Sequence, residues 1–495
     1  MIQATLRPHQ ERALVLLRQS ILSGRRRPIL QLPTGAGKTV IAASIVDGAR
    51  SKGKRVLFTV PALSLVDQTV EAFFKEGITD LGVIQGKHVM TDWSRPVQIA
   101  SVQTLQRRTF PEADVVVIDE AHRWFDFYGK WMSDPSWLGK PMIGLSATPW
   151  TRGLGRYFDD LIIAATTADL IKAGYLAPFR VFAPSHPDLT GVRTVAGDYH
   201  EGDLSEAMSK QALIADVVDT WLKLGQNRST FCFGVDRAHA KHLQQEFERA
   251  GVKTGYIDAF TPAQERSEIG ERFHSGEIRV VCNVACLTTG IDWDVRCIVM
   301  ARPTKSEILF VQIIGRGLRT AECKEELLIL DHSDSTLRLG FVTDIHHEKL
   351  DDGRTRANGK MPASIRLPKA CPNCSYLKPP RVQVCPSCGF KAEKTSEVEV
   401  GDGELIEVTG RRKKTEMTTE EKAAFFAQLK GYAQQRGYSE GWASHKFREK
   451  FDVWPNHYKS VMAAEPTPKV LSWIKSRQIA WAKSKHNTHG KHAAA

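Results

Sequence analysis

Two glycines, a lysine and a threonine stand together in the segment LPTGAGKT, residues 32–39. Gly35 and Gly37 free the backbone to turn its N–H groups toward phosphate oxygens. Lys38 can then reach the β- and γ-phosphates, and the Thr39 hydroxyl can hold Mg²⁺. The segment begins with leucine where the strict pattern has glycine, and a glycine-rich turn with a chance lysine is the alternative. The predicted phosphate loop consists of Pro33, Thr34, Gly35, Ala36, Gly37, Lys38 and Thr39.

Two adjacent carboxylates, Asp119 and Glu120, end the apolar run 115–118 in the sequence VVVIDEAH. A carboxylate at the carboxyl end of a strand points into the crevice where open α/β sheets bind ligands. Asp119 is predicted to hold Mg²⁺ through its water shell. Glu120 is predicted to orient and deprotonate the water that attacks a γ-phosphate. An isolated DEAH tetrapeptide could be a solvated turn, but here it follows a phosphate loop.

Four cysteines form two CxxC pairs within the segment CPNCSYLKPPRVQVCPSCGF, residues 371–390. Each pair can fold into a tight turn that offers two thiolates, and two such turns close a tetrahedral Zn²⁺ site. Because all four ligands are thiolates, the site should be structural and give folding energy to a small segment. Redox-active pairs are the alternative. The predicted zinc ligands are Cys371, Cys374, Cys385 and Cys388.

The stretch VQIIGRGLR, residues 311–319, reads as a short helix with an apolar side. Gln312, Arg316 and Arg319 are three or four positions apart, which predicts that they share the other side. Gly315 and Gly317 interrupt this helix, at a cost of about 1 kcal/mol each relative to alanine. Such a helix is expected where the backbone must approach something closely.

Two series of short apolar segments alternate with helical patterns, which predicts α/β architecture with parallel sheets. Strands are expected at 29–32, 56–60, 97–101, 115–119 and 143–146, and again at 230–233, 255–258, 279–283, 297–300 and 327–331. Helices are expected at 39–50, 65–75, 237–250, 262–274 and 308–318.

The composition is typical of an intracellular protein with buried hydrophobic cores. The chain has 495 residues, 42% of them hydrophobic, and a formal net charge of +12, which makes a polyanionic partner plausible. No apolar signal segment or membrane span is expected, and no cysteine precedes Cys232. We therefore expect the cytoplasm of a bacterial cell or of a phage-infected host, with no membrane partner.

Taken in order, the segments resemble the motifs of a superfamily 2 DEAD/DEAH-type helicase, most closely the bacterial and phage RadD-like helicases. The matching segments are LRPHQ (6–10), LPTGAGKT (32–39), VPALSLVDQ (60–68), SVQTL (101–105), DEAH (119–122), LSATP (145–149), FCFGVDRAHA (231–240), VACLTTGID (284–292) and QIIGRGLR (312–319). The resemblance implies two RecA-like domains with ATP bound between them.

The resemblance also implies roles for residues of that cleft. Arg316 and Arg319 would stabilise the charge on the transferred γ-phosphate, and Gln312 would contact that phosphate or the catalytic water. Ser146 and Thr148 would couple hydrolysis to domain movement. The remaining implied nucleotide contacts are Arg7, Gln10, Gly290 and Asp292, with Gln10 at the adenine edge.

A motor that translocates should grip the sugar–phosphate backbone rather than the bases. By the resemblance, hydroxyl, amide and backbone groups of several motifs would do so. A Ser or Thr at the end of a strand can instead simply cap a helix. The candidates for nucleic-acid contact are Pro61, Ser64, Gln68, Ser101, Thr104, Thr288 and Thr289.

The last hundred residues read as basic and helical, with a capping box Thr418–Glu421 before a helical run. Trp473 and Trp481 lie among lysines and arginines, so they could either pack in a core or contact nucleic acid. Lys378 and Arg381 of the cysteine segment could offer DNA a basic face. The expected domains are 1–165 and 166–345 (RecA-like), 346–395 (linker and zinc ribbon) and 396–495 (helical).

These observations predict an ATP-dependent DNA helicase or translocase that uses ATP, Mg²⁺ and Zn²⁺ in repair, recombination or replication. Single-stranded or branched DNA is the expected partner, and a single-strand-binding, replication or repair protein is a further candidate. Two alternatives remain: an RNA helicase, and a DNA-stimulated ATPase that remodels a protein without unwinding.

Overall fold

The computed structural model describes residues 3–288, 293–354, 367–391 and 417–477. The chain divides into two compact units, 1–394 and 395–495, which we describe separately. Among the described residues, no helix has both the length and the apolar character that a membrane span requires.

The first part of unit one, which runs from α1 to α6 (residues 8–172), is here called lobe one. It is built on a parallel sheet of seven strands in the order β3-β4-β2-β5-β6-β1-β7. Its five inner strands are largely buried, as expected for a sheet covered on both faces. The strands are β1 (Pro28–Gln31), β2 (Val56–Val60), β3 (Leu81–Ile84), β4 (Val97–Ser101), β5 (Val115–Ile118), β6 (Met142–Ser146) and β7 (Asp160–Ile163).

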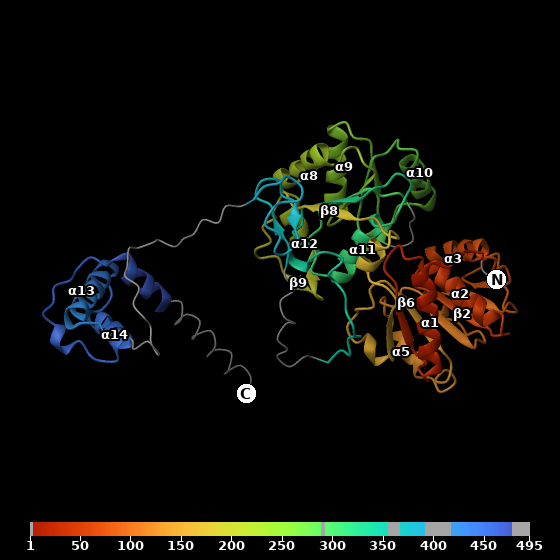
Figure 1. The fold of residues 1–495 in the computed structure, drawn as a ribbon, viewed down its shortest axis with the longest axis horizontal. Helices are drawn as coiled ribbons and strands as arrows, with labels where there is room; N and C mark the ends of the chain where they lie inside the picture. The colour runs from red at the N-terminus through yellow and green to blue at the C-terminus, as the bar shows by residue number, and fades with distance from the viewer. Residues whose placement is uncertain (1–2, 289–292, 355–366, 392–416, 478–495) are drawn as a thin grey trace. The chain divides into compact units, whose positions relative to one another are not determined.

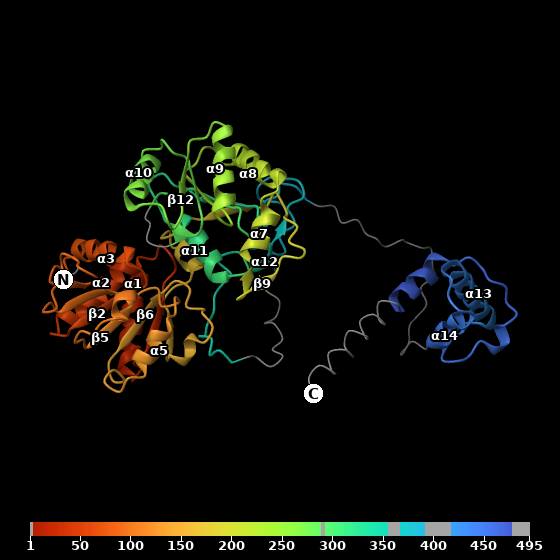
Figure 2. The same ribbon diagram turned by 180° about the vertical axis from the view of Figure 1, so that it is seen from behind.

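Helices lie on both faces of this sheet, as the two opposite views in Figure 1 and Figure 2 show. The core on one face includes side chains of α1, α2 and α3, and the core on the other includes the aromatic residues Tyr128, Trp131 and Phe158. The helical segments of lobe one are α1 (Pro8–Leu22), α2 (Lys38–Arg50), α3 (Ser64–Lys75), α4 (Val102–Leu105), α5 (Asp126–Met132), η1 (Leu154–Arg156) and α6 (Thr167–Lys172).

The second part of unit one, which runs from β8 to α12 (residues 179–339), is here called lobe two. It is built on a six-stranded parallel sheet in the order β12-β13-β11-β14-β15-β8. The strands are β8 (Phe179–Phe182), β11 (Thr230–Phe233), β12 (Thr254–Ile257), β13 (Val280–Asn283), β14 (Cys297–Met300) and β15 (Leu327–Asp331). The other elements are the hairpin β9 (Thr194–Val195) and β10 (Asp198–Tyr199), α7 (Glu201–Met208), α8 (Gln211–Leu224), α9 (Arg237–Arg249), α10 (Ala263–His274), η2 (Cys286–Thr288), α11 (Glu307–Gly317) and α12 (Ser335–Leu339).

All ten predicted strands are confirmed to within one residue at each end. Within the two parallel sheets the prediction missed β3, β7 and β8, each at the edge of its sheet, and it also missed the two short hairpins β9–β10 and β16–β17. Strands β7 and β8 are only partly buried, so they lack a continuous apolar run. Strand β3 is four residues long and includes Gly82, which weakens a strand pattern.

The cysteine segment packs against the edge of lobe two. It carries the short strands β16 (Lys369–Ala370) and β17 (Leu377–Lys378). The backbone N–H of Ala183 donates to the carbonyl of Ser375 at 2.9 Å, and Tyr376 forms an antiparallel bridge with Phe182 of β8. Leu377 is fully buried in the core of unit one. The segment therefore shares the core of lobe two instead of standing apart from it.

Unit two, within its described part 417–477, contains α13 (Thr419–Arg436), α14 (Glu440–Phe451), η3 (Asn456–Tyr458) and a helical stretch over 468–477. The predicted capping box is confirmed, because the Thr418 side chain and Glu421 bond each other's backbone N–H groups. These helices enclose a small core of Phe425, Leu429, Phe447 and Ile474. Trp473 packs against this core, whereas Trp481 lies outside the described residues.

Candidate active site

A cavity of about 590 Å³ is lined by residues of both lobes. Lobe one contributes the phosphate loop, the pair Asp119 and Glu120, and one face of α3. Lobe two contributes Arg316 and Arg319. The lining residues are Arg7, Leu32, Pro33, Thr34, Gly35, Gly37, Lys38, Thr39, Leu65, Gln68, Thr69, Glu71, Ala72, Lys75, Asp119, Glu120, Ala147, Arg316, Arg319 and Thr320.

The phosphate loop runs from the end of β1 to the start of α2. Gly35 and Gly37 have φ values of 89° and 79°, in the left-handed region that favours glycine. A side chain at Gly37 would also collide with the amide nitrogen of Gln10. The loop therefore needs glycine at these positions, both for its turn and for the close approach of α1.

Gln10 is buried under the loop. Its amide nitrogen donates to the Ala36 carbonyl at 3.1 Å, and its amide oxygen accepts from the Arg7 backbone N–H at 2.8 Å. His9 also contacts the Ala36 carbonyl, at 3.0 Å. Gln10 thus supports the shape of the loop, and its contact with an adenine edge stays a prediction. His9 was missed by the sequence reasoning, although it lies inside the segment LRPHQ.

Lys38 forms the electrostatic centre of the cavity. Its ammonium group lies 3.0 Å from Asp119 and bonds directly to Glu120. Burial lowers the pKa of Lys38, but the two carboxylates outweigh burial and hold that pKa above its ordinary value. Burial likewise raises the pKa of Glu120, but neighbouring positive charge, chiefly that of Lys38, outweighs burial and holds that pKa below its ordinary value. Glu120 is therefore ionised at neutral pH.

Glu120 has an unusual backbone conformation, with φ of 48°. Residues other than glycine seldom adopt this left-handed region, and they do so chiefly where the surroundings enforce it. Its N–H donates to the Asp119 carboxylate at 2.9 Å, which holds the turn. As a result, the two consecutive carboxylates both reach Lys38.

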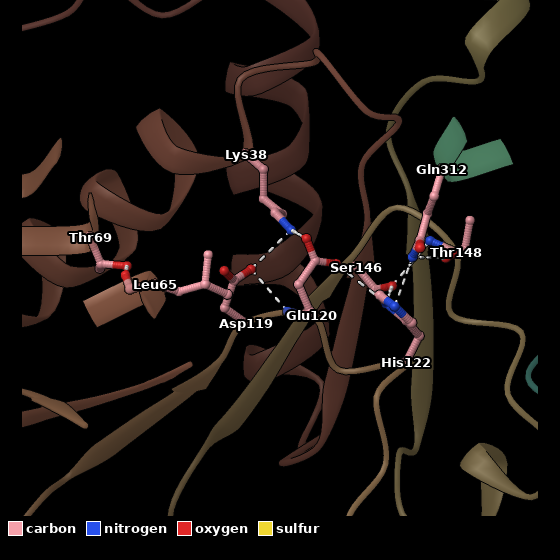
Figure 3. Close-up of polar contacts among 9 residues, drawn as sticks. All are labelled: Lys38, Leu65, Thr69, Asp119, Glu120, His122, Ser146, Thr148 and Gln312. Atoms are coloured by element: carbon pink, nitrogen blue, oxygen red, sulfur yellow. Dashed lines mark hydrogen bonds and ion pairs between the residues drawn. The ribbon is translucent and has the colours of Figure 1, made fainter. Parts of the chain in front are cut away.

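His122 connects this charged group to the rest of the site (Figure 3). Its Nδ1 atom lies 3.0 Å from the Ser146 hydroxyl and 3.3 Å from the Glu120 carboxylate. The Ser146 hydroxyl also accepts the backbone N–H of Thr148 at 3.0 Å. Sequence reasoning placed His122 in the DEAH segment but gave it no role.

The other ring nitrogen of His122 meets lobe two. The Gln312 amide nitrogen lies 2.8 Å from His122 Nε2 and 3.4 Å from the Thr148 hydroxyl. Burial lowers the pKa of His122 to about 4, so the ring is neutral at neutral pH. A neutral ring with one N–H can accept from Gln312 and donate from Nδ1 at the same time. Lys38, Glu120, His122 and Gln312 therefore form one chain of polar contacts across the two lobes.

Helix α11 differs from the prediction at its end. It stops at Gly317, so Arg319 does not share a helical face with Gln312 and Arg316. Arg319 instead follows the helix and forms an antiparallel bridge with Leu176. Residues 311–318 are all buried, because the polar side of the helix faces lobe one rather than solvent. Arg316 is only 7% exposed, and its charge helps to lower the pKa of Glu120.

The two glycines of α11 serve different contacts. A Cβ atom at Gly315 would lie 2.6 Å from the Cβ of Thr34 in the phosphate loop. A Cβ atom at Gly317 would instead meet Leu327 and Ile298 of its own lobe. Gly315 therefore permits the approach of the two lobes, and Gly317 permits the packing of the helix on its sheet.

Several predicted nucleic-acid contacts of lobe one lie at the adjacent ends of β2 and β4, where Val60 is paired with Ser101. Ser101 is fully buried and caps α4 by accepting the Thr104 N–H at 3.3 Å, which is the capping arrangement given as the alternative. Gln68 lines the cavity between the two lobes. The Thr288 hydroxyl donates to the Ala285 carbonyl at 2.8 Å.

Two of the remaining candidates are described. Pro61 is buried and its carbonyl accepts from Gln103 at 2.7 Å, whereas Ser64 is exposed at the start of α3. The roles of all these residues in binding nucleic acid stay predictions. Thr289, Gly290 and Asp292 lie outside the described residues.

The four cysteines of the 371–390 segment converge as predicted. All four sulfur atoms lie within 4.8 Å of one another, and the pairs Cys371–Cys388 and Cys374–Cys385 are 3.8 and 3.7 Å apart. Four sulfurs at about 2.3 Å from one tetrahedral zinc ion would be about 3.8 Å apart. The geometry can hold a metal ion. Lys378 is not free for DNA, because it is buried and donates to the Gln383 carbonyl at 3.3 Å.

The chain is similar to known proteins over both lobes. Residues 3–151 match the family described as "Type III restriction enzyme, res subunit", and residues 210–321 match "Helicase conserved C-terminal domain". A "51.5 kDa protein" of a Lactococcus phage is 27% identical over 412 residues, which cover 80% of this chain and 85% of that protein.

Two further relatives are named helicases. The "putative ATP-dependent helicase IRC3" of Saccharomyces cerevisiae is 30% identical over 66% of this chain and 51% of its own length. The chain thus spans about half of that relative. The "ATP-dependent DNA helicase uvsW" of phage T4 is 24% identical over 63% of this chain and 66% of its own length.

The two family matches, the ordered motifs and the named helicase relatives together support a superfamily 2 helicase of the DEAD/DEAH type. The same matches support an ATP-hydrolysing enzyme, and the cavity described above lies between the two lobes.

Proposed function

We propose that the protein is a DNA motor that hydrolyses ATP at the cleft described above and uses lobe closure to move along or unwind DNA. The observation that carries this proposal is the contact between Gln312 and His122, which joins lobe two to the residue beside Glu120. A closed cleft of this kind couples chemistry to domain movement, as a motor requires.

In this proposal, the residues of lobe one bind ATP and activate the attacking water. The N–H groups of the phosphate loop and Lys38 hold the phosphates of ATP, and Thr39 and Asp119 would hold Mg²⁺, which neutralises phosphate charge. Glu120 accepts a proton from the attacking water, and its ionised state at neutral pH suits a base.

The residues of lobe two complete the site. Arg316 and Arg319 stabilise the charge that develops on the γ-phosphate, because both line the same cavity as Lys38. Phosphate transfer is coupled to the lobe interface through His122, which contacts Gln312 and Ser146. Thr148 contacts both of these residues. Gly290 and Asp292 are proposed contacts on the same side of the cleft.

We propose DNA rather than RNA as the track. The relative uvsW is named a DNA helicase, and a strongly basic chain favours a polyanion. Single-stranded or branched DNA is the proposed form, and a RadD-like role in repair, recombination or replication is the proposed setting. A single-strand-binding protein is the proposed protein partner.

We further propose that the four-cysteine cluster holds one structural Zn²⁺. The sulfur spacing supports this, and four thiolates leave no open position for catalysis. The metal would fold the segment onto lobe two, where Tyr376 and Leu377 pack.

One experiment tests the proposal as a whole. ATP hydrolysis is measured without nucleic acid and with single-stranded DNA, forked DNA and RNA, for wild type and for Glu120→Gln. We expect stimulation by DNA above that by RNA, and none in the variant. Equal stimulation by RNA would overturn the choice of DNA, and stimulated turnover in Glu120→Gln would overturn the role of Glu120. A strand-displacement assay then separates a helicase from a translocase or a protein-remodelling ATPase.

A further inference from the structure

Lys324 makes an unusual set of contacts just after helix α11. Its ammonium nitrogen donates to three backbone carbonyls, of Val295 at 2.7 Å, Gly317 at 2.6 Å and Arg319 at 2.6 Å. A protonated lysine has three N–H donors. All three are therefore used on backbone oxygens, and within the part of the chain that the structure describes Lys324 forms no ion pair.

Two of these carbonyls belong to the segment that carries the cleft arginines. Gly317 is the last residue of α11, and the last carbonyls of a helix have no partner within it. A cation at this end also complements the helix dipole. The contact with Arg319 fixes the backbone of that arginine directly, and the contact with Gly317 fixes the residue that follows Arg316.

The third carbonyl ties this segment to the sheet. Val295 is fully buried just before β14, one of the inner strands of lobe two. Lys324 therefore joins the end of α11 and the backbone of Arg319 to a rigid part of the lobe. Side chains that act within the cleft must be held to about half an ångström, which such a tie provides.

We propose that Lys324 is a positioning residue for ATP hydrolysis, because it holds the backbone from Gly317 to Arg319 in the place from which the two arginines reach the cleft. The inference rests on the proposed role of those arginines. Lys324 itself lines no part of the cavity and touches no reacting atom.

The same contacts make the tie sensitive to alkaline pH. Burial lowers the pKa of Lys324 to about 8, Asp294 opposes this shift, and Arg296 and Arg319 add to it. A neutral amine has only two N–H donors, so one of the three carbonyls loses its bond. Turnover should therefore decline as the pH rises through about 8.

Protein stability responds in the opposite direction. The folded pKa lies below the ordinary value of 10.5, so between about 8 and 10.5 the unfolded chain binds more protons. The contribution of this lysine to the free energy of unfolding therefore grows with pH in that window. A decline in turnover there would therefore not come from the contribution of Lys324 to stability, and the melting temperature at each pH shows whether the protein as a whole unfolds.

The test compares wild type, Lys324→Met, Lys324→Arg and the control Lys223→Met, which removes an exposed lysine of α8. Stimulated ATP hydrolysis is measured from pH 7 to 9.5, with the melting temperature at each pH. We expect Lys324→Met to lower kcat by about tenfold or more with KM for ATP within about threefold, as loss of a transition-state contact implies. The alkaline decline should be present in wild type and Lys223→Met, and absent in Lys324→Arg, which stays charged.

A wild-type profile that stays flat from pH 7 to 9.5 would overturn the proposal, and this arm needs no variant to fold. Equal kcat in Lys324→Met and Lys223→Met would also overturn it. Arg316→Ala and Arg319→Ala are measured in parallel. If both keep normal turnover, the proposed role of the arginines fails; if either loses turnover while Lys324→Met does not, only the role of Lys324 fails.

Discussion

The amide nitrogen of Gln312 lies 2.8 Å from the Nε2 atom of His122, and this contact joins the two lobes beside the Glu120 carboxylate (Figure 3). Gln312 comes from α11 of lobe two, and His122 follows Glu120 by two residues in lobe one. A hydrogen bond in this buried position depends on how closely the lobes approach. It can therefore link the state of the nucleotide to the arrangement of the lobes.

Gln312→Leu should uncouple the two lobes. The substitution leaves the phosphate loop intact, so we expect ATP affinity within about threefold of wild type and DNA-stimulated kcat reduced by about a hundredfold, in the range of a lost catalytic contact. Steady-state kinetics with and without DNA measure both quantities. Gln244→Leu on the exposed side of α9 is the matched control and should behave as wild type.

Arg316→Ala should separate binding from turnover. Arg316 lines the cavity and lies near enough to Glu120 to lower its pKa, so its charge matters most when the γ-phosphate is transferred. We expect kcat to fall by about a thousandfold, as for other arginines in this role, with little change in ATP affinity. Equal losses in affinity and turnover would contradict the assignment. Nucleotide titration and single-turnover hydrolysis provide the two measurements.

His122 should make stability fall in mildly acidic solution. Its folded pKa is about 4, below the ordinary 6.5, so the unfolded chain binds more protons between these values. The stabilising contribution is complete above pH 6.5 and is lost as the pH falls toward 4. Between pH 6.5 and 5 the loss should be on the order of 2 kcal/mol. Urea unfolding of wild type and His122→Asn across this range measures it, and parallel curves for the two proteins would exclude His122 as the cause.

The two glycines of α11 should respond differently to alanine. Gly315→Ala replaces a poor helix former, so we expect unchanged or higher stability. The substitution also places a methyl group 2.6 Å from the Cβ of Thr34 in the other lobe, so we expect a severe loss of hydrolysis because the lobes can no longer approach. Gly317→Ala would overpack the helix against Leu327 and should destabilise the protein by about 1–3 kcal/mol. Thermal melts and ATPase rates on both variants distinguish these outcomes, and the reverse pattern would contradict the structural account.

Removal of the proposed zinc should loosen the cysteine segment while sparing the cleft. We expect about one zinc per chain by atomic absorption in wild type and none in Cys374→Ser, which loses one of four ligands. The exposed Cys323, outside the cluster, provides the control Cys323→Ser, which should keep its metal. Equal metal content in both variants would exclude this cluster as the site.

The sequence alone predicted the inner strands, the phosphate loop and the carboxylate pair, because each depends on local pattern. It could not predict the environment of α11, since the buried polar face of that helix exists only where two lobes meet. Periodicity also placed Arg319 on the helix, but the helix ends at Gly317. The role of His122 was missed for the same reason, because both of its partners outside the DEAH segment, Ser146 and Gln312, are distant in sequence.

The cysteine segment also protects an exposed edge. Strand β8 ends the sheet of lobe two, and Tyr376 and Ser375 occupy part of its outer side. An uncovered edge strand presents unpaired N–H and C=O groups to any other chain. Detachment of the segment would therefore expose a template for pairing between copies. Such detachment would be seen first as self-association of the protein, before any loss of turnover.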